Sequence, residues 1–229
     1  MPTADPQLPA ANRPNSNVRW RIAQFFELRW WKRYLANKDK QAYLDWKRAY
    51  WQRFLEMSGI EIAPGARVLD AGCGPAGIFT ILQAREVHAL DPLLDHYEAE
   101  LPHFRRADYP QVRFFNQPLE SFAPADEGYD VVFCLNAINH VADLEAAFDR
   151  LLALTRPGGT LAVSVDAHNY WLLKRIFRLV PGDILHPHQY DLVEYESMLT
   201  RRGLRVECTV LVKKELIFNY FLLVAIRDK

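Results

Sequence analysis

The stretch Val68–Gly77 constrains this chain most, because it places a full G-x-G-x-x-G spacing directly after a predicted strand. Glycines at Gly72, Gly74 and Gly77 permit a tight turn and let the backbone approach a ligand closely. Acidic Asp91 ends the next predicted strand, where a carboxylate is expected to hydrogen-bond a ribose hydroxyl. The pattern therefore predicts a nucleotide-binding turn, and its alternative is a tight strand-to-helix turn that binds no ligand.

Short apolar runs alternate with helical stretches after Arg67. The predicted strands are Val68–Asp70, Val87–Leu90, Val112–Phe115, Tyr129–Leu135 and Leu161–Val165. Predicted helices lie between them at Ile78–Arg85, Leu93–Leu101 and Leu144–Leu154. Such alternation is typical of an α/β fold in which helices cover both faces of a parallel sheet.

The C-terminal end departs from this alternation. A predicted helix at Leu192–Arg202 stops at Gly203, and two strand-like runs follow at Arg205–Lys213 and Phe218–Ile226. The connection between these runs, Lys214–Ile217, is too short for a crossover helix. The two runs are therefore expected to pair as an antiparallel hairpin.

The N-terminal part divides into a tail and a helical cap. Residues 1–17 are rich in Pro, Ala and Asn, which predicts a disordered tail and not a signal peptide. Two helices are predicted at Val18–Leu35 and Gln41–Met57, and Gly59 supplies the stop signal for the second. We therefore expect a cap over residues 18–59 and a main domain over residues 60–229.

Charge and cysteine content limit the partners and the compartment. Basic and acidic residues balance at 28 each, so no overall basic field recruits nucleic acid, and no nucleic-acid partner is expected. The three cysteines, Cys73, Cys134 and Cys208, are far apart and lack zinc-site spacing. This pattern favours free thiols in the cytoplasm, and no metal site is expected.

Asp70 separates two interpretations of the glycine turn. A dinucleotide-binding turn usually has a small or apolar residue two places before the first glycine, since a carboxylate there would repel the pyrophosphate. A ligand with a cationic amino-acid end and no phosphate would tolerate this carboxylate. The position of Asp70 thus disfavours a nicotinamide or flavin dinucleotide.

Four segments, in their order and spacing, resemble the class I S-adenosylmethionine-dependent methyltransferases. They are Asp70–Gly77, Leu90-Asp91-Pro92, Tyr129-Asp130-Val131-Val132 and Arg156-Pro157-Gly158-Gly159-Thr160-Leu161. The resemblance covers about Arg67 to Lys229 and is greatest to small-molecule enzymes, including those of quinone biosynthesis. It implies a Rossmann-like, seven-stranded, mostly parallel sheet whose C-terminal hairpin is antiparallel. The implied cofactor is S-adenosylmethionine, with S-adenosylhomocysteine as product.

The resemblance also implies a role for each matching position. Asp70 would lie beneath the methionine ammonium, and Asp91 would hold the ribose hydroxyls. The remaining implied cofactor residues are Ala71, Gly72, Cys73, Gly74 and Gly77 at the turn, Pro92, Gln117, Pro118 and Leu119 around the adenine, and Leu135 and Asn136 near the methionine. Where the family often has Glu-His, this chain has Asn139-His140, so no acidic role is implied there.

Histidines after the strands are the candidates for chemistry on the acceptor. His140 is the first choice for a general base, and its alternative is a packing or capping role at the next helix. His186 and His188 precede the last helix, where substrate contact and a rigid loop are both open interpretations. His168 carries the same substrate-binding hypothesis in a weaker form.

The predicted cap is aromatic and basic. Five of the six tryptophans lie in its two helices, at Trp20, Trp30, Trp31, Trp46 and Trp51. One interpretation is an aromatic face that packs on the sheet or over the pocket, beneath a solvated basic face. The other is contact with an apolar substrate or a membrane surface. A second apolar and basic stretch, Trp171–Leu179, supports a hydrophobic or amphipathic acceptor.

Together these features predict methyl transfer from S-adenosylmethionine to a small molecule, hydrophobic or aromatic in character. Two alternatives remain open. One is a nicotinamide-dependent oxidoreductase that uses the same glycine turn, and the other is a methyltransferase-like binding protein without turnover. The sequence predicts neither the acceptor atom nor the oligomeric state.

Overall fold

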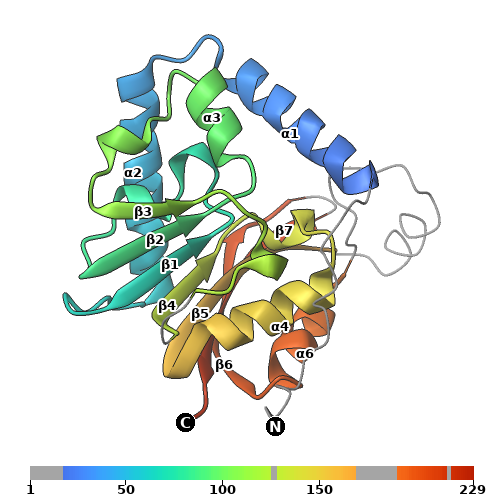
Figure 1. Cartoon of the computed structure of the whole chain (residues 1–229). Coiled ribbons are helices and arrows are strands. Elements are labelled where there is room, and N and C mark those ends of the chain that lie inside the picture. The colour runs from blue at the N-terminus through green and yellow to red at the C-terminus, as the bar shows by residue number, and fades with distance from the viewer. Residues whose placement is uncertain (1–17, 125–127, 169–189, 216–217) are drawn as a thin grey trace, which may run out of the picture.

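The computed structural model describes residues 18–124, 128–168, 190–215 and 218–229. Within them, seven strands form one sheet in the order β3-β2-β1-β4-β5-β7-β6 (Figure 1). The strands are β1 (Arg67–Ala71), β2 (Glu86–Leu90), β3 (Val112–Phe115), β4 (Tyr129–Cys134), β5 (Thr155–His168), β6 (Leu204–Lys213) and β7 (Phe218–Arg227). The helices are α1 (Val18–Leu35), α2 (Lys40–Ser58), α3 (Leu94–Glu100), α4 (Leu144–Leu154) and α6 (Leu192–Thr200).

The strand pairing confirms the predicted topology. Strands β1 to β5 pair in parallel, while β7 pairs antiparallel with both β5 and β6. The hairpin expected at the C-terminal end is therefore present, and it inserts β7 between β5 and β6. β5 begins earlier than predicted, because Thr155 pairs with Tyr129 before a register shift leads into the apolar run.

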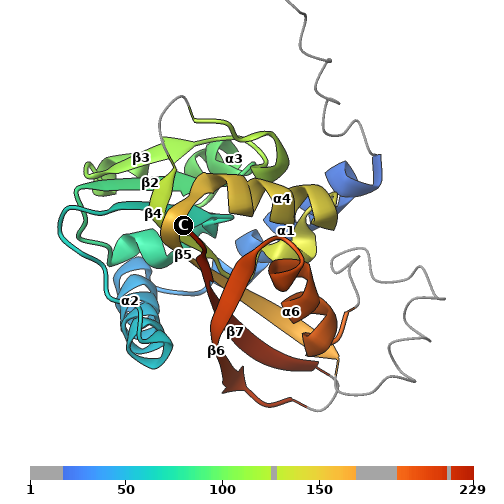
Figure 2. The same cartoon turned by 90° about the horizontal axis from the view of Figure 1, so that it is seen from below.

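Two apolar layers enclose the sheet. One buried cluster joins β1 and β2 to α2 and α3 and includes Phe54, Val68 and Tyr97. The other joins the opposite face to α4 and α6 and includes Phe148 and Leu199. Figure 2 shows α2 on the opposite side of the sheet from α4 and α6. Alternate side chains of the central strands thus fill both layers, as a parallel sheet covered on both faces requires.

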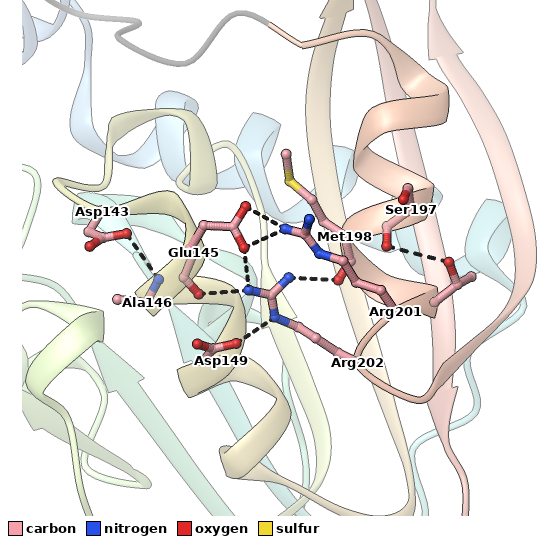
Figure 3. A network of polar contacts seen from close by, with 9 residues as sticks. Asp143, Glu145, Ala146, Asp149, Ser197, Met198, Arg201 and Arg202 are labelled. Carbon is pink, nitrogen blue, oxygen red and sulfur yellow. Dashed lines mark hydrogen bonds and ion pairs between the residues drawn. The ribbon is translucent and has the colours of Figure 1, made fainter.

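The two helices that cover the second face are joined by ion pairs (Figure 3). Arg202, just after α6, donates from Nε to the Asp149 carboxylate at 2.6 Å and from a guanidinium NH2 to Glu145 at 2.6 Å. Its other terminal nitrogen donates to the backbone oxygen of Met198 at 2.9 Å. Arg201 pairs with the same Glu145 carboxylate. These contacts fix α6 against α4, beside the hairpin.

Local signals explain the helix ends of the cap. The Asp39 side chain accepts a hydrogen bond from the Ala42 amide at 2.9 Å and so caps α2. Gly59 ends that helix with a φ of 64°, as its predicted stop signal requires. In Figure 1, α1 lies apart from both faces of the sheet and beside α3. Lys32 of α1 reaches Glu100 of α3 at 2.8 Å.

The helix predicted over Ile78–Arg85 is wrong. This segment contains a short 3₁₀ turn at Ile78–Thr80, then a bend into β2. Ile78, Phe79 and Thr80 include two β-branched side chains, which lose rotamer freedom in a helix. Thr80 instead donates its hydroxyl to the Gly77 carbonyl oxygen at 2.8 Å, while Ile78 and Phe79 are buried in the core.

No helix among the described residues is long and apolar enough to cross a membrane.

Candidate cofactor and acceptor site

The site lies where the chain reverses its direction across the sheet. From β1 the order continues through β2 to β3 on one side, and β4 and β5 lie on the other. Open α/β sheets bind ligands at such a switch point, beyond the carboxyl ends of the strands. Register brings Ala71 level with Leu90, so the segments that follow β1 and β2 begin side by side.

The first half of the glycine turn requires glycine for backbone conformation and for space. Gly72 and Gly74 have φ angles of 73° and 57°, in the left-handed region that side chains disfavour. A Cβ at Gly72 would overlap the Cβ of Ala137 in the segment after β4. The Gly72 amide donates to the Leu90 carbonyl oxygen at 2.7 Å. The turn is therefore folded closely over the ends of two neighbouring strands.

Gly77 is needed for space alone, because its φ of −74° suits any residue. A Cβ there would overlap the Asp70 carboxylate and the Cys73 carbonyl oxygen. Asp70 is 1% exposed, and its Oδ2 accepts a hydrogen bond from the Phe79 amide at 3.0 Å. Burial raises the pKa of Asp70 to about 7. Asp70 thus lies beneath the turn and connects it to the following segment, Ile78–Thr80.

Asp91 orders the turn from the end of β2. Its Oδ2 accepts from the Gly74 amide at 2.9 Å, and its Oδ1 accepts from the Leu93 amide at 2.8 Å. Burial, followed by the nearby Glu27 carboxylate, raises the pKa of Asp91 to about 7. Two backbone donors therefore fix the carboxylate in one orientation at the wall of a cavity.

That cavity has a volume of about 500 Å³, and most of the predicted cofactor residues line it. Its sheet-side wall contains Ala71, Gly72, Cys73, Gly74, Asp91, Pro92, Gln117, Pro118, Leu119, Leu135 and Asn136. His140, the predicted base, lies on the same wall and is half-buried. Segments that follow four different strands are thus brought together around one space.

Several predicted residues are placed elsewhere. Asp70 and Gly77 support the turn from below and do not line the cavity. His168 is also outside the lining; it is buried at the end of β5, with its ring 4.4 Å from that of Phe218. His186 and His188 lie outside the described residues, as does the stretch Trp171–Leu179. The substrate roles of these histidines stay predictions.

The opposite wall comes from the cap. One interpretation of the sequence put an aromatic face of the cap on the sheet or over the pocket, without assigning individual cap residues to the site. Helix α1 contributes a stripe at intervals of three and four residues, namely Trp20, Gln24, Glu27, Trp31 and Tyr34. Helix α2 contributes Tyr43, Trp46, Lys47 and Trp51. The spacing along α1 is a helical signal visible in the sequence. The sequence does not show that this stripe faces the glycine turn, because that depends on how α1 packs.

Helix α2 is anchored to the turn by one buried hydrogen bond. The Trp51 indole donates to the Ala76 carbonyl oxygen at 2.9 Å, and Trp51 is 3% exposed. The same helix carries Lys47, whose ammonium nitrogen lies 4.5 Å from the centroid of the Trp51 ring. Burial lowers the pKa of Lys47 to about 8, while Asp70 opposes that change. Lys47 therefore lies on the cavity wall, close enough to interact electrostatically with the Asp70 carboxylate beneath the turn.

The comparisons with known proteins agree with this geometry. The methyltransferase domain family matches residues 40–209 of the chain. A trans-aconitate 2-methyltransferase from Variovorax paradoxus (strain S110) is 30% identical over 149 residues, which cover 61% of this chain and 57% of that protein. A ubiquinone biosynthesis O-methyltransferase from Xanthomonas campestris pv. campestris is 35% identical over 105 residues, 44% of this chain and 43% of that protein. The matches thus cover about half the length of these relatives.

Among solved structures, one similar fold is the 1,6-didemethyltoxoflavin-N1-methyltransferase of Burkholderia thailandensis, with bound 1,6-didemethyltoxoflavin and S-adenosylhomocysteine. Its TM-score is 0.64 at 16% identity, over 99% of this chain and 95% of that one. This similarity extends across the helical cap as well as the sheet. The family match covers well over half of the chain and includes the glycine turn, β2 and β4. The chain therefore belongs to the methyltransferase domain family, which confirms the resemblance to class I enzymes with S-adenosylmethionine as cofactor.

Proposed function

We propose that this chain transfers the methyl group of S-adenosylmethionine to a small aromatic or otherwise hydrophobic acceptor. The observation that carries the proposal is one cavity shared by the glycine turn, the Asp91 carboxylate and an aromatic cap. The turn offers close backbone approach because Gly72 and Gly74 have no side chains. Asp91 offers a fixed hydrogen-bond acceptor for hydroxyls.

The donors and acceptors of the cavity fit the proposed cofactor at both ends. Asp91 would accept hydrogen bonds from the ribose, next to Pro92 and the adenine residues Gln117 to Leu119. Lys47 would pair with the methionine carboxylate, since it lines the cavity and interacts electrostatically with Asp70, which the resemblance puts beneath the methionine ammonium. Among the described residues that line the cavity, Lys47 is the one Lys or Arg. A carboxylate is therefore the group that Lys47 would bind best.

The character of the cap supports an aromatic acceptor. Trp20, Trp30, Trp31, Tyr34 and Trp46 line the cap side of the cavity, opposite the turn. Aromatic rings pack against such walls by stacked or edge-on contacts, each contributing about 0.5–1.5 kcal/mol beyond area burial. With Lys47 assigned to the cofactor, the described part of these walls offers no second Lys or Arg. A polycarboxylic acid would therefore bind less well here than a phenol or a heteroaromatic ring.

The chemistry asks little of the protein besides positioning. The bound cofactor supplies an electrophilic methyl group on a positively charged sulfur. The cavity walls would hold the acceptor in line with that group, which reduces the entropic part of the barrier. His140 would accept the acceptor's proton, because it lies on the cavity wall beside Asn136 and Val141. Replacement of His140 by Asn should then lower turnover of phenols about 10²-fold and leave cofactor affinity within about twofold.

A transfer assay with labelled methyl donor tests the acceptor class. The panel contains phenols, quinols, heteroaromatic amines, lipids and trans-aconitate, the last two of which probe contrasting chemistries. We expect turnover of at least one aromatic compound and none of trans-aconitate. Turnover of trans-aconitate alone would contradict the aromatic acceptor, and absence of all turnover together with cofactor binding would favour a binding protein.

The lysine assignment has its own test. Lys47→Met should weaken S-adenosylhomocysteine about tenfold, because the carboxylate loses its partner. The same change should leave 5′-methylthioadenosine, which lacks the amino acid, within about twofold. Equal losses for both ligands would show that Lys47 acts on the shape of the cavity and not on the carboxylate.

We also propose that α1 touches a membrane surface from which an apolar acceptor could enter. Ile22, Phe25, Phe26 and Trp30 are exposed at 41%, 61%, 45% and 49% on this helix. Arg21, Arg29 and Arg33 accompany them, a combination that suits an anionic interface. Co-sedimentation with vesicles containing an anionic phospholipid should exceed that with neutral vesicles. A Phe25→Ser, Phe26→Ser variant should sediment less with both kinds of vesicle, and sedimentation equal to that of the wild type would refute the contact.

A further inference from the structure

Glu27 is a carboxylate that the proposed cofactor site does not yet use. It is the single acidic residue in α1, which otherwise carries arginines, a lysine and aromatic side chains. It belongs to the stripe of α1 that lines the cavity, with Gln24 and Trp31 on either side. A carboxylate on the inner face of a helix has a cost in free energy, since a charged group there loses hydrogen bonds to water.

Tyr97 holds the Glu27 carboxylate in place. The Tyr97 hydroxyl donates to Glu27 Oε1 at 3.3 Å, and Trp31 lines the cavity one helical turn further along α1. Tyr97 belongs to α3, the helix that directly follows Asp91 and Pro92, and it is fully buried. Glu27 therefore lies on the cap side of the cavity whose sheet side contains Asp91.

Asp91 faces Glu27 from the sheet side. Burial raises the pKa of both carboxyl groups, and the nearby Glu27 carboxylate raises the pKa of Asp91 further. Within the described part of the chain, no lysine or arginine forms an ion pair with either acid. Two acids that face each other without a cation destabilise the empty protein.

Each acid nevertheless keeps acceptor capacity for a ligand. Asp91 accepts one backbone hydrogen bond on each oxygen, and a carboxylate oxygen can accept two. Glu27 has Oε2 besides the oxygen that Tyr97 binds. A ligand with two adjacent hydroxyl donors would place one hydrogen bond on each acid. A vicinal diol therefore matches this pair of acceptors, because its two hydroxyl hydrogens would offset the repulsion between the carboxylates.

We propose that Glu27 is a cofactor-binding residue that forms, with Asp91, a two-carboxylate site for the vicinal hydroxyls of the cofactor ribose. This inference rests on the proposed function, because it assumes that the adenosine end lies at Asp91. It gives the cap a direct part in cofactor recognition, since α1 would contribute one of the two acceptors. Cofactor binding would then draw α1 and β2 together through the sugar.

Calorimetry with ribose-modified ligands tests the pair. The probes are S-adenosylhomocysteine and its 2′-deoxy and 3′-deoxy analogues, each titrated into the wild type and Glu27→Gln. We expect Glu27→Gln to weaken the parent ligand about tenfold, which corresponds to about 1.4 kcal/mol. For the analogue that lacks the hydroxyl bound by Glu27, the substitution should change affinity by less than about twofold. The other analogue should still respond as the parent does.

Equal affinity of wild type and Glu27→Gln for S-adenosylhomocysteine would overturn the inference. An equal loss for all three ligands would also overturn it, because Glu27 would then act without contacting a hydroxyl. If the wild type fails to bind S-adenosylhomocysteine at all, the proposed function itself fails. These results are distinct, so one experiment separates the two claims.

Two further variants guard against a purely structural effect. Arg29→Gln changes the charge of α1 on its exposed face and should leave all three affinities unchanged. Without ligand, Glu27→Gln should melt at the wild-type temperature or above, since it removes repulsion from Asp91. A lower melting temperature with a wild-type ligand-induced shift would assign Glu27 to folding alone. If Glu27→Gln does not fold, Glu27→Ala is measured against the same expectations.

Discussion

Replacement of Gly72 by alanine tests why the turn needs glycine. The substitution adds a Cβ at a φ of 73°, and that atom would overlap the Cβ of Ala137. A non-glycine residue in the left-handed region costs about 1–2 kcal/mol. Overpacking of a rigid neighbour costs about 1–3 kcal/mol more. We therefore expect Gly72→Ala to lower the free energy of unfolding by about 2–5 kcal/mol.

Two matched variants separate the two costs. Gly59 has a φ of 64°, but a Cβ there would meet no atom within 4 Å, so Gly59→Ala measures the backbone cost alone. Ala137→Gly removes the atom that Gly72→Ala would strike. In the double variant Gly72→Ala, Ala137→Gly, the loss should be smaller than the sum of the single losses by about 1–3 kcal/mol.

Urea unfolding followed by tryptophan fluorescence gives each free energy by linear extrapolation. A loss for Gly72→Ala no larger than that for Gly59→Ala would refute the overlap with Ala137. Strictly additive losses in the double variant would refute it independently. Either result would mean that the segment after β4 does not lie close against the turn.

Three further predictions concern parts outside the cavity lining. Asp39→Ala should lower the free energy of unfolding by about 1 kcal/mol, because α2 loses its N-terminal cap; a change below about 0.3 kcal/mol would contradict the capping role. Arg202→Met should cost about 1–3 kcal/mol in urea unfolding, since Asp149 and Glu145 lose their shared partner, whereas Arg150→Met, at a half-buried position of α4 outside this cluster, should cost less. Asp70 has a pKa of about 7 in the folded protein against an ordinary 3.8, so the folded state holds a proton that the unfolded state releases. Its contribution to stability is therefore greatest below the ordinary value and falls as pH rises through about 7; Asp70→Asn should reduce the loss of stability between pH 5 and pH 8, and an unchanged loss would refute the shift.

The sequence predicted the sheet because its signals are local. The apolar run at residues 131–134 of β4, for example, is buried on both faces, so it is recognised as a strand without knowledge of its neighbours. The hairpin followed from the short connection between its two runs. The prediction of a helix at Ile78–Arg85 was wrong because local groups compete for its hydrogen bonds. The Phe79 amide donates to the Asp70 carboxylate, and the Thr80 hydroxyl donates to the Gly77 carbonyl oxygen.

Part of the site could not be recognised from the sequence, because it depends on how the turn and the cap pack in three dimensions. Gly72, Gly74 and Asp91 belong to a compact pattern, and the structure places them at the cavity. Gly77 and Asp70 belong to the same pattern, yet they support the turn from beneath. The sequence shows an aromatic stripe along α1 but not which strand ends it faces. The position of Glu27 opposite Asp91 therefore required the tertiary structure.

Calorimetric titration with S-adenosylhomocysteine, and separately with NAD, tests the central claim most directly. We expect S-adenosylhomocysteine to bind the wild type with one site per chain and NAD to give no saturable heat. Asp91→Ala should weaken the former at least tenfold, because the ribose loses its fixed acceptor. Binding of NAD alone, or unchanged affinity of Asp91→Ala for S-adenosylhomocysteine, would contradict the assignment of this cavity to the methyl donor.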